Sequence, residues 1–277
     1  MPVLRHSDAD LDFDVRGDDG PAVVQLHGLT SSRAREDLIA VDLVGDLTGC
    51  RVLRYDARGH GLSTGPRDAS SYAWSLLAED LLALLEHVFP GEEVYGVGSS
   101  MGSGTLVHAA AAAPTTFSGL TLCIPPTAWE TRVAQGAGYE ECARVVETAG
   151  VDALVEAGRL TPLPPAENPD KPVTWPDVAL DLLPTVFRGA ALTDLPAPDV
   201  VATIDLPTLL LAWVEDPAHP VSTSELLHDL LPQSELVVAR THPEVLRWPG
   251  LVSARVTASR SGQVGRPSLA AQPGQEP

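Results

Sequence analysis

The chain has 277 residues, of which 44% are hydrophobic and 20% charged, so it can bury one sizeable core. This composition excludes a mini-protein and a chain that is disordered throughout. Acidic residues outnumber basic residues by 37 to 18, which gives a formal net charge of −19. A uniformly acidic surface repels phosphate groups, so we expect neither nucleic acid nor a membrane surface among the partners.

The N-terminal sequence carries acidic residues where a secretory signal needs an apolar stretch. The chain has no apolar run of about 18 residues, the length that a membrane-spanning helix requires. Its three cysteines are widely spaced and form no CxxC pair, which favours neither a disulfide framework nor a zinc cluster. We therefore expect a soluble, cytoplasmic protein.

Short apolar runs alternate with helical patterns along most of the chain, which is typical of a parallel sheet covered by helices. A helix is expected over 74–88, another from Ser100, and a third where Ser222 and Glu225 have capping-box spacing. The fold class expected is α/β, with a mainly parallel, doubly wound sheet. The runs that predict its buried strands are 21–26, 51–55, 93–98, 119–124, 207–213 and 235–239.

The alternation breaks between about residues 125 and 205. Helical stretches are expected there over 139–149 and 177–190, and six prolines between Pro162 and Pro176 exclude a helix or an inner strand between them. We interpret this part as an inserted helical cap, and the stretch from residue 259 onward as a disordered tail. The expected division is a core of residues 1–127 and 206–258, a cap of residues 128–205 and a tail of residues 259–277.

The sharpest local signal is Gly98-Ser99-Ser100-Met101-Gly102, between a predicted strand and a predicted helix. A serine on such a tight turn needs small residues two positions away on each side, because its backbone brings neighbouring elements close while its hydroxyl is exposed. This pattern predicts that Ser100 is a nucleophile. A glycine-rich turn also serves packing or phosphate binding, but the lysine of a P-loop is absent here.

Four motifs appear in order: His27-Gly28 after the first predicted strand, residues 56–63 (DARGHGLS), the turn at Ser100, and Asp216-Pro217. Together they make the chain resemble the α/β-hydrolase fold family, in its serine hydrolase branch with a helical cap, over about residues 10–258. The fold class that the resemblance implies agrees with the one that the periodicity predicts.

The resemblance also implies roles for particular residues. The backbone N–H groups of Leu29 and Met101 correspond to the oxyanion hole. Asp216 corresponds to the acid that orients the catalytic base, with Glu215 and Glu130 as rivals. The base follows the acid in the family's chain order.

The histidine is the least conventional part of this pattern. The family usually presents a Gly-His pair after the last strand, whereas this chain has Thr241-His242 there, without the glycine. His242 still lies in the expected loop, and we take it as the catalytic base. His219 is expected to be a surface residue of the loop that carries Asp216.

Arg58 and His60, in the motif at 56–63, are expected to shape the site rather than to react. The same expectation holds for the side chain of His27. No cofactor is implied, and no metal either, because the sequence has no HExxH motif and a serine mechanism requires none.

The acyl pocket is expected between the core and the cap. Apolar cap residues are candidates for its walls, although the same residues would equally form the cap's own packing. The candidates are Trp129, Val133, Tyr139, Leu183, Val186 and Phe187.

These observations predict a serine hydrolase that cleaves a carboxylic ester, thioester or lactone through an acyl-enzyme intermediate, with a small acyl compound as its substrate. Two alternatives stay open. One is carbon–carbon bond hydrolysis or a non-hydrolytic acyl rearrangement on the same triad. The other is a degenerate hydrolase that binds a small ligand without turnover. The oligomeric state is left open.

Overall fold

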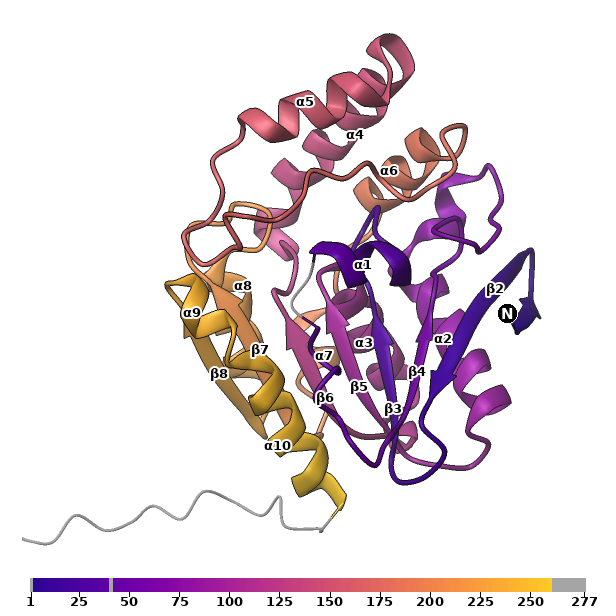
Figure 1. Ribbon diagram of the computed structural model, residues 1–277, viewed down its shortest axis with the longest axis vertical. Coiled ribbons are helices and arrows are strands. Elements are labelled where there is room, and N and C mark those ends of the chain that lie inside the picture. The colour runs from indigo at the N-terminus through magenta and orange to yellow at the C-terminus, as the bar shows by residue number, and fades with distance from the viewer. Residues whose placement is uncertain (1, 40–41, 261–277) are drawn as a thin grey trace, which may run out of the picture.

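An eight-stranded sheet forms the centre of the protein in the computed structural model, which describes residues 2–39 and 42–260 (Figure 1). The strand order is β1-β2-β4-β3-β5-β6-β7-β8. β2 pairs antiparallel with β1 and β4, and all other neighbours are parallel. The strands are β1 (Val3–His6), β2 (Ala9–Arg16), β3 (Ala22–Leu26), β4 (Arg51–Tyr55), β5 (Val94–Ser99), β6 (Phe117–Cys123), β7 (Thr208–Trp213) and β8 (Ser234–Ala239). The mainly parallel, doubly wound sheet expected from the sequence is confirmed.

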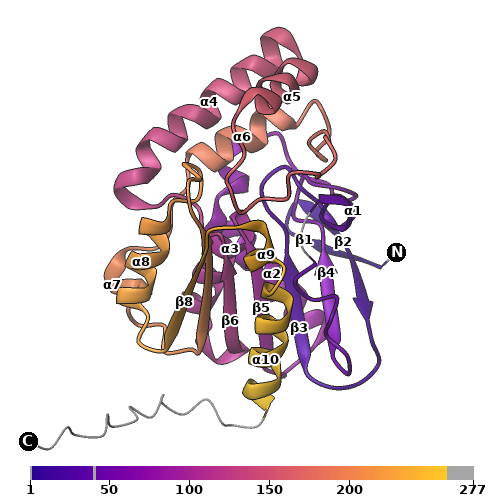
Figure 2. The same ribbon diagram turned by 60° about the vertical axis from the view of Figure 1, so that its left-hand side comes forward.

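Helices follow most of the strands and cover both faces of the sheet (Figure 2). The α-helices are α1 (Arg33–Ile39), α2 (Trp74–Val88), α3 (Met101–Ala112), α4 (Arg132–Ala149), α5 (Val151–Leu160), α6 (Leu183–Ala191), α7 (Pro198–Val201), α8 (Val221–Leu230), α9 (His242–Val245) and α10 (Trp248–Arg260). Three short 3-10 helices are η1 (Ala69–Tyr72), η2 (Pro114–Thr116) and η3 (Trp129–Thr131).

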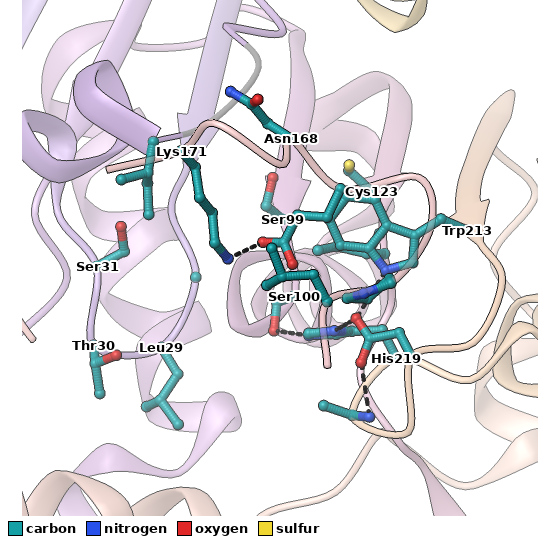
Figure 3. A pocket seen from close by; sticks show the side chains of 18 of the residues that line it. Leu29, Thr30, Ser31, Ser99, Ser100, Cys123, Asn168, Lys171, Trp213 and His219 are labelled. Atoms are coloured by element: carbon teal, nitrogen blue, oxygen red, sulfur yellow. Dashed lines mark hydrogen bonds and ion pairs between the residues drawn. The ribbon is translucent and has the colours of Figure 1, made fainter. Parts of the chain in front are cut away.

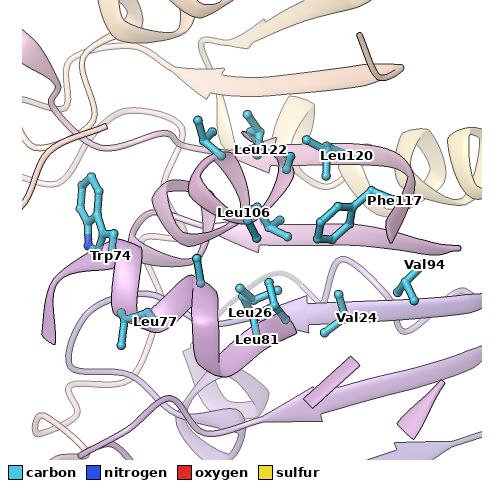
Figure 4. Close-up of a cluster of buried hydrophobic side chains, with 14 of the residues drawn as sticks. Val24, Leu26, Trp74, Leu77, Leu81, Val94, Leu106, Phe117, Leu120 and Leu122 are labelled. Atoms are coloured by element: carbon cyan, nitrogen blue, oxygen red, sulfur yellow. The ribbon is translucent and has the colours of Figure 1, made fainter. Parts of the chain in front are cut away.

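The alternation of side chains along the strands divides the core between the two faces of the sheet. Val24 and Leu26 of β3 pack with α2, α3 and α8 in one buried cluster, in which Leu106 lies at the centre of α3 (Figure 4). Val23, which precedes Val24 and points to the other face, belongs to the second cluster. That cluster joins the opposite face to α10 through residues such as Trp248. Burial on both faces explains why the inner strands are continuous apolar runs.

The antiparallel strands β1 and β2 were not expected from the sequence. β2 alternates apolar residues with aspartates, so it has no compact apolar run. Two of these aspartates, Asp12 and Asp14, pair with the buried Arg33, which also pairs with Asp56 beyond β4. Paired charges of this kind allow acidic residues to occupy a strand that packs on the core.

Residues 128–205, all of which the structure describes, contain α4 to α7 and no strand. The helix expected over 139–149 begins seven residues earlier, at Arg132, and the one expected over 177–190 is α6, which begins only at Leu183. The proline-rich stretch between them is irregular, as expected. In both views α4, α5 and α6 lie over the carboxyl ends of the parallel strands (Figures 1 and 2).

Two expectations near the C-terminus are wrong. α8 begins at Val221 rather than through a capping box of Ser222 and Glu225, because Pro220 holds the extended N-cap position and places Ser222 inside the first turn. The expected tail boundary at residue 259 is also displaced, since α10 continues to Arg260. The remainder of the expected tail, residues 261–277, lies outside the described residues.

The close packing of α3 on β3 predicts that a larger residue at Gly102 destabilises the fold. A Cβ added at Gly102 would lie 2.7 Å from the carbonyl oxygen of Leu26, whereas one added at Gly138, inside α4, would meet no atom within 4 Å. We expect Gly102→Ala to lower the free energy of unfolding by about 1–3 kcal/mol. Gly138→Ala should raise it by about 0.5–1 kcal/mol through helix propensity. Urea titration of both variants measures the difference, and equal effects would contradict the packing described.

Candidate active site

Ser100 lies on the turn that joins β5 to α3, where it is the N-cap of the helix. Its backbone has φ 51° and ψ −112°, a conformation that residues other than glycine adopt only with strain. The Ser100 N–H donates to the carbonyl of Cys123 at the end of β6, at 3.0 Å. The Ser103 hydroxyl donates to the same carbonyl and to that of Gly98. These bonds hold the turn in place with the Ser100 hydroxyl at the carboxyl edge of the sheet.

The glycines on either side of Ser100 are required for space. A Cβ at Gly98 would lie 2.5 Å from the carbonyl oxygen of Gly102, and one at Gly102 would strike Leu26. The need for small residues on both sides of the serine therefore comes from these close backbone contacts. Only glycines let β3, β5 and α3 approach closely enough to form this turn.

Asp216 follows β7, two strands away from β5 in the sheet. Its carboxylate accepts hydrogen bonds from the indole N–H of Trp213 at 2.8 Å and from the backbone N–H of Ala218 at 3.0 Å. Burial would raise the pKa of the Asp216 carboxyl, but the hydrogen bond and charge of His219 and the hydrogen bond from Trp213 outweigh it. The pKa is lowered to about 2, so the carboxylate is ionised at neutral pH.

His219 joins Asp216 to Ser100 (Figure 3). Its Nδ1 donates to the Asp216 carboxylate at 2.8 Å, which leaves Nε2 to accept from the Ser100 hydroxyl, also at 2.8 Å. The loop reverses direction between the acid and the histidine, and the His219 N–H donates to the Asp216 carbonyl. The Ala218 carbonyl accepts from the Thr127 N–H, which ties the loop to the end of β6.

The expectation that His242 bridges Ser100 and Asp216, with His219 pointing elsewhere, is wrong. His242 opens α9 beyond β8, one strand farther from Ser100 than the Asp216 loop. Its Nδ1 lies 3.4 Å from the carbonyl oxygen of Ala166, in the proline-rich stretch. The Asp-x-x-His spacing could have indicated His219. A turn of three residues is enough to bring the imidazole back to the carboxylate of the aspartate that precedes it.

The two rivals of Asp216 take no part in this arrangement. Glu215 precedes the acid and has φ 63°, so it forms the turn that leads to the acid. Glu130 lies in η3, whose neighbouring Trp129 is held by the Asp194 carboxylate. The hydrogen bonds to Trp213 and His219 distinguish Asp216 from both glutamates.

The residues expected to form the oxyanion hole, Leu29 and Met101, come from two different segments. A Cβ at Gly28 would lie 3.6 Å from the Ser100 Cβ, so the loop that continues into Leu29 runs beside the nucleophile turn. Met101 is the first residue of α3, where backbone N–H groups have no acceptor inside the helix. The Met101 N–H therefore lies next to Ser100 at the positive end of a helix, whereas the role of the Leu29 N–H stays a prediction.

His27 and His60 are buried and support the loops around the site. His27 donates from Nδ1 to the Gly28 carbonyl and accepts at Nε2 from the Ala57 N–H, at 2.8 and 2.9 Å. Burial, with a smaller contribution from His27, lowers the pKa of His60 to about 3, so it stays neutral. Arg58 makes a bidentate pair with Asp80. These contacts agree with the structural roles expected for the three residues.

A cavity of about 690 Å³ opens above the serine. Both the core and the proline-rich stretch contribute to its lining, and Figure 3 shows Ser100, His219 and Trp213 along one side. Tyr139 and Phe187, two of the six expected wall residues, line it and stack on each other with ring centroids 6.3 Å apart.

The other four expected wall residues do not line the cavity. Leu183 and Val186 are buried in the packing of the α4–α6 region, and Val133 is 80% exposed. Trp129 instead donates its indole N–H to the Pro196 carbonyl. Helical periodicity marks the buried face of a helix, but most of that face here packs against neighbouring helices rather than a cavity.

The described part of the chain holds no cluster of three or more His, Cys, Asp or Glu side chains placed to bind a metal ion. Within residues 2–39 and 42–260, no helix has both the length and the apolar character needed to cross a bilayer.

Comparison with known families agrees with this geometry. The family model described as serine aminopeptidase, S33, matches residues 19–179, more than half of the chain. The chain therefore belongs to this family of α/β-hydrolases.

Three relatives illustrate the range of similarity. The probable oxidoreductase EphD of Mycobacterium tuberculosis is 36% identical over 85 residues, 31% of this chain but only 14% of the length of that protein. The 3-oxoadipate enol-lactonase 2 of Acinetobacter baylyi is 25% identical over 192 residues, 68% of this chain and 69% of the relative. A hydrolase from Pseudomonas aeruginosa superposes with a TM-score of 0.73 at 24% identity, over 94% of this chain and 97% of the other.

The lowered pKa of Asp216 predicts a stability effect with a definite sign. An acid whose pKa is lower in the folded state stabilises the fold above its unfolded value, near 4, and this stabilisation is lost as the pH falls towards 2. Asp216→Asn has no such titration. As the pH falls from about 5 to about 2.5, we therefore expect the free energy of unfolding of the wild type to decrease relative to that of Asp216→Asn. Urea titrations at several pH values measure it, and a constant difference would contradict the environment described.

Proposed function

We propose that the protein is a serine hydrolase that cleaves a carboxylic ester, thioester or lactone through an acyl-enzyme intermediate. The observation that carries the proposal is the continuous chain of hydrogen bonds from the Ser100 hydroxyl through His219 to Asp216, at the base of a cavity. This chain is the arrangement by which a neutral imidazole activates a serine.

In the first half of the reaction, the Ser100 oxygen attacks the carbonyl carbon while Nε2 of His219 takes the hydroxyl proton. The Asp216 carboxylate stabilises the resulting imidazolium and holds its orientation. Negative charge develops on the carbonyl oxygen, and we assign its stabilisation to the N–H groups of Leu29 and Met101. His219 then passes the proton to the leaving oxygen or sulfur as its bond to the carbonyl carbon breaks.

In the second half, water attacks the acyl group on Ser100 while His219 accepts a proton from it. The bond between the acyl carbon and the serine oxygen breaks, and the proton returns to Ser100. The net reaction consumes one water and releases an acid. For a lactone, the acid and the alcohol remain in one molecule.

The similarity to an enol-lactonase favours the ester and lactone class over other reactions of the fold. Two further observations bear on the alternatives. The serine at the turn disfavours the dehalogenases and epoxide hydrolases of this fold, which resemble one another in carrying an aspartate there. The hydrogen-bonded base disfavours a degenerate binding protein, because the unconventional loop at His242 is not needed for the triad.

Replacing the nucleophile tests the proposal most directly. Ser100→Ala should lower para-nitrophenyl ester hydrolysis by a factor on the order of 10⁶. It should also abolish labelling by a fluorophosphonate probe, with the thermal midpoint nearly unchanged, because the hydroxyl acts in chemistry rather than in packing. Retention of more than about a tenth of wild-type activity by the variant would refute the role of Ser100.

The choice of base has its own test in a pair of matched variants. His219→Ala should lower kcat by a factor of about 10⁴ to 10⁶, because members of a triad act as a unit. His242→Ala removes an imidazole of the cavity wall and should lower kcat less than about tenfold. Steady-state kinetics on one ester, with thermal midpoints to verify folding, distinguish the two. A larger loss in His242→Ala than in His219→Ala would restore His242 as the base.

A further inference from the structure

A recess of about 520 Å³ adjoins the cavity above Ser100. The two share part of their lining, including Thr30, Arg35, Lys171 and Phe187, so the recess continues the cavity beneath α5 and the proline-rich stretch. Ser100 lines the cavity but not the recess. A substrate held at the serine therefore has room for a second end, away from the reacting carbonyl.

The recess is cationic, unlike the protein as a whole. Its lining includes Arg35, Arg159 and Lys171 and, among the described residues, no aspartate or glutamate. Acidic residues outnumber basic ones by 37 to 18 in the sequence, and Lys171 is the chain's single lysine. Figure 3 shows its side chain extending into the cavity that contains Ser100 and His219.

Two of the three cations already have carboxylate partners. The Lys171 ammonium group pairs with Glu167, and one terminal nitrogen of Arg159 lies 3.7 Å from the Glu156 carboxylate. Both cations thus have an acidic neighbour within the protein.

Arg35 is the exception. Its Nε donates to the Thr174 hydroxyl at 2.9 Å, but no carboxylate of residues 2–39 and 42–260 lies within ion-pair distance of its guanidinium. The neighbouring Glu36 instead accepts from the Ser31 hydroxyl. Burial lowers the pKa of Arg35, and the attraction of Glu36 and Asp177 does not make up for it. A half-buried guanidinium without an ionic partner is costly, and a bound anion would remove that cost.

We propose that the substrate carries a carboxylate at the end remote from the scissile carbonyl, and that Arg35 binds it in this recess. The inference deepens the proposed hydrolase function and rests on it. A guanidinium presents paired N–H donors that match a carboxylate. Lys171 and Arg159 already have carboxylate neighbours, so Arg35 is the cation of the recess left to pair with a carboxylate of the substrate.

The rest of the recess fits an aliphatic linker. Apolar side chains make up much of its lining, so methylene groups between the carboxylate and the carbonyl would find apolar contacts there. The side chains are Ile39, Leu154, Val155, Leu163, Val173 and Phe187. The substrate class is therefore a half-ester of a dicarboxylic acid, or a lactone that bears a carboxylate on an aliphatic arm.

The experiment compares pairs of para-nitrophenyl esters that differ only at the end of the acyl chain. One member of each pair ends in a methyl group, as in the hexanoate, and the other in a carboxylate, as in the adipate half-ester, over several chain lengths. We expect the wild type to favour the carboxylate member at the best chain length. Arg35→Gln should lower the ratio of kcat/KM for the two members about ten- to a hundredfold, mainly through KM.

Two further variants serve as controls. Arg35→Lys keeps the charge without the paired donors and should restore only part of the ratio. Arg144→Gln removes an exposed arginine of α4 that pairs with Glu141 and lines neither cavity, and it should leave the ratio unchanged. Thermal midpoints verify that each variant is folded.

Competitive inhibition of methyl-ended ester hydrolysis separates the possible anions. Inhibition by adipate that weakens in Arg35→Gln supports the proposal, whereas inhibition by inorganic phosphate alone overturns the carboxylate assignment. Hydrolysis of both esters with a ratio that Arg35→Gln does not change overturns the inference and leaves the hydrolase function standing. Failure of the wild type to hydrolyse any ester, with no labelling of Ser100, overturns the proposed function itself.

Discussion

The turn between β5 and α3 is the constraint on which the site depends. Its strained backbone at Ser100 persists because β3 packs closely against it and hydrogen bonds link it to β5, β6 and α3. Gly98 and Gly102 allow these elements to approach, and a side chain at either position would collide with backbone atoms. The rigid core thereby presents one hydroxyl at the edge of the sheet where the loops of the site gather.

The loop after β7 supplies two members of the proposed triad, Asp216 and His219. The Asp216 carboxylate receives N–H groups from Trp213, Ala218 and His219, so one short loop holds the acid and orients the imidazole. Neighbouring parallel strands lie about 4.8 Å apart, and β7 is one strand closer to Ser100 than β8. The segment after β8 is thus left to form part of the cavity wall, where His242 lies.

The pairing of arginines with carboxylates differs between the core and the cavity. Buried arginines of the core are matched by aspartates, as Arg33 is by Asp12 and Asp56 and Arg58 is by Asp80. Arg35, on the cavity side of α1, has no such match. In a protein with 37 acidic residues, an unmatched arginine beside the proposed active site is the feature that bears most directly on substrate class.

The parallel sheet, the α2 helix and the serine turn could be predicted from the sequence, because each depends on local periodicity or on glycines at fixed spacing. The sequence also pointed to Asp216, which lies three residues beyond the end of β7. It did not determine β2, whose aspartates are balanced by Arg33 from another element, nor which apolar cap residues line the cavity. Tertiary structure alone decided between His219 and His242. The choice depends on the sheet order and on a three-residue turn that brings the imidazole back to its acid. Neither can be read from the number of residues that separate the acid from each histidine.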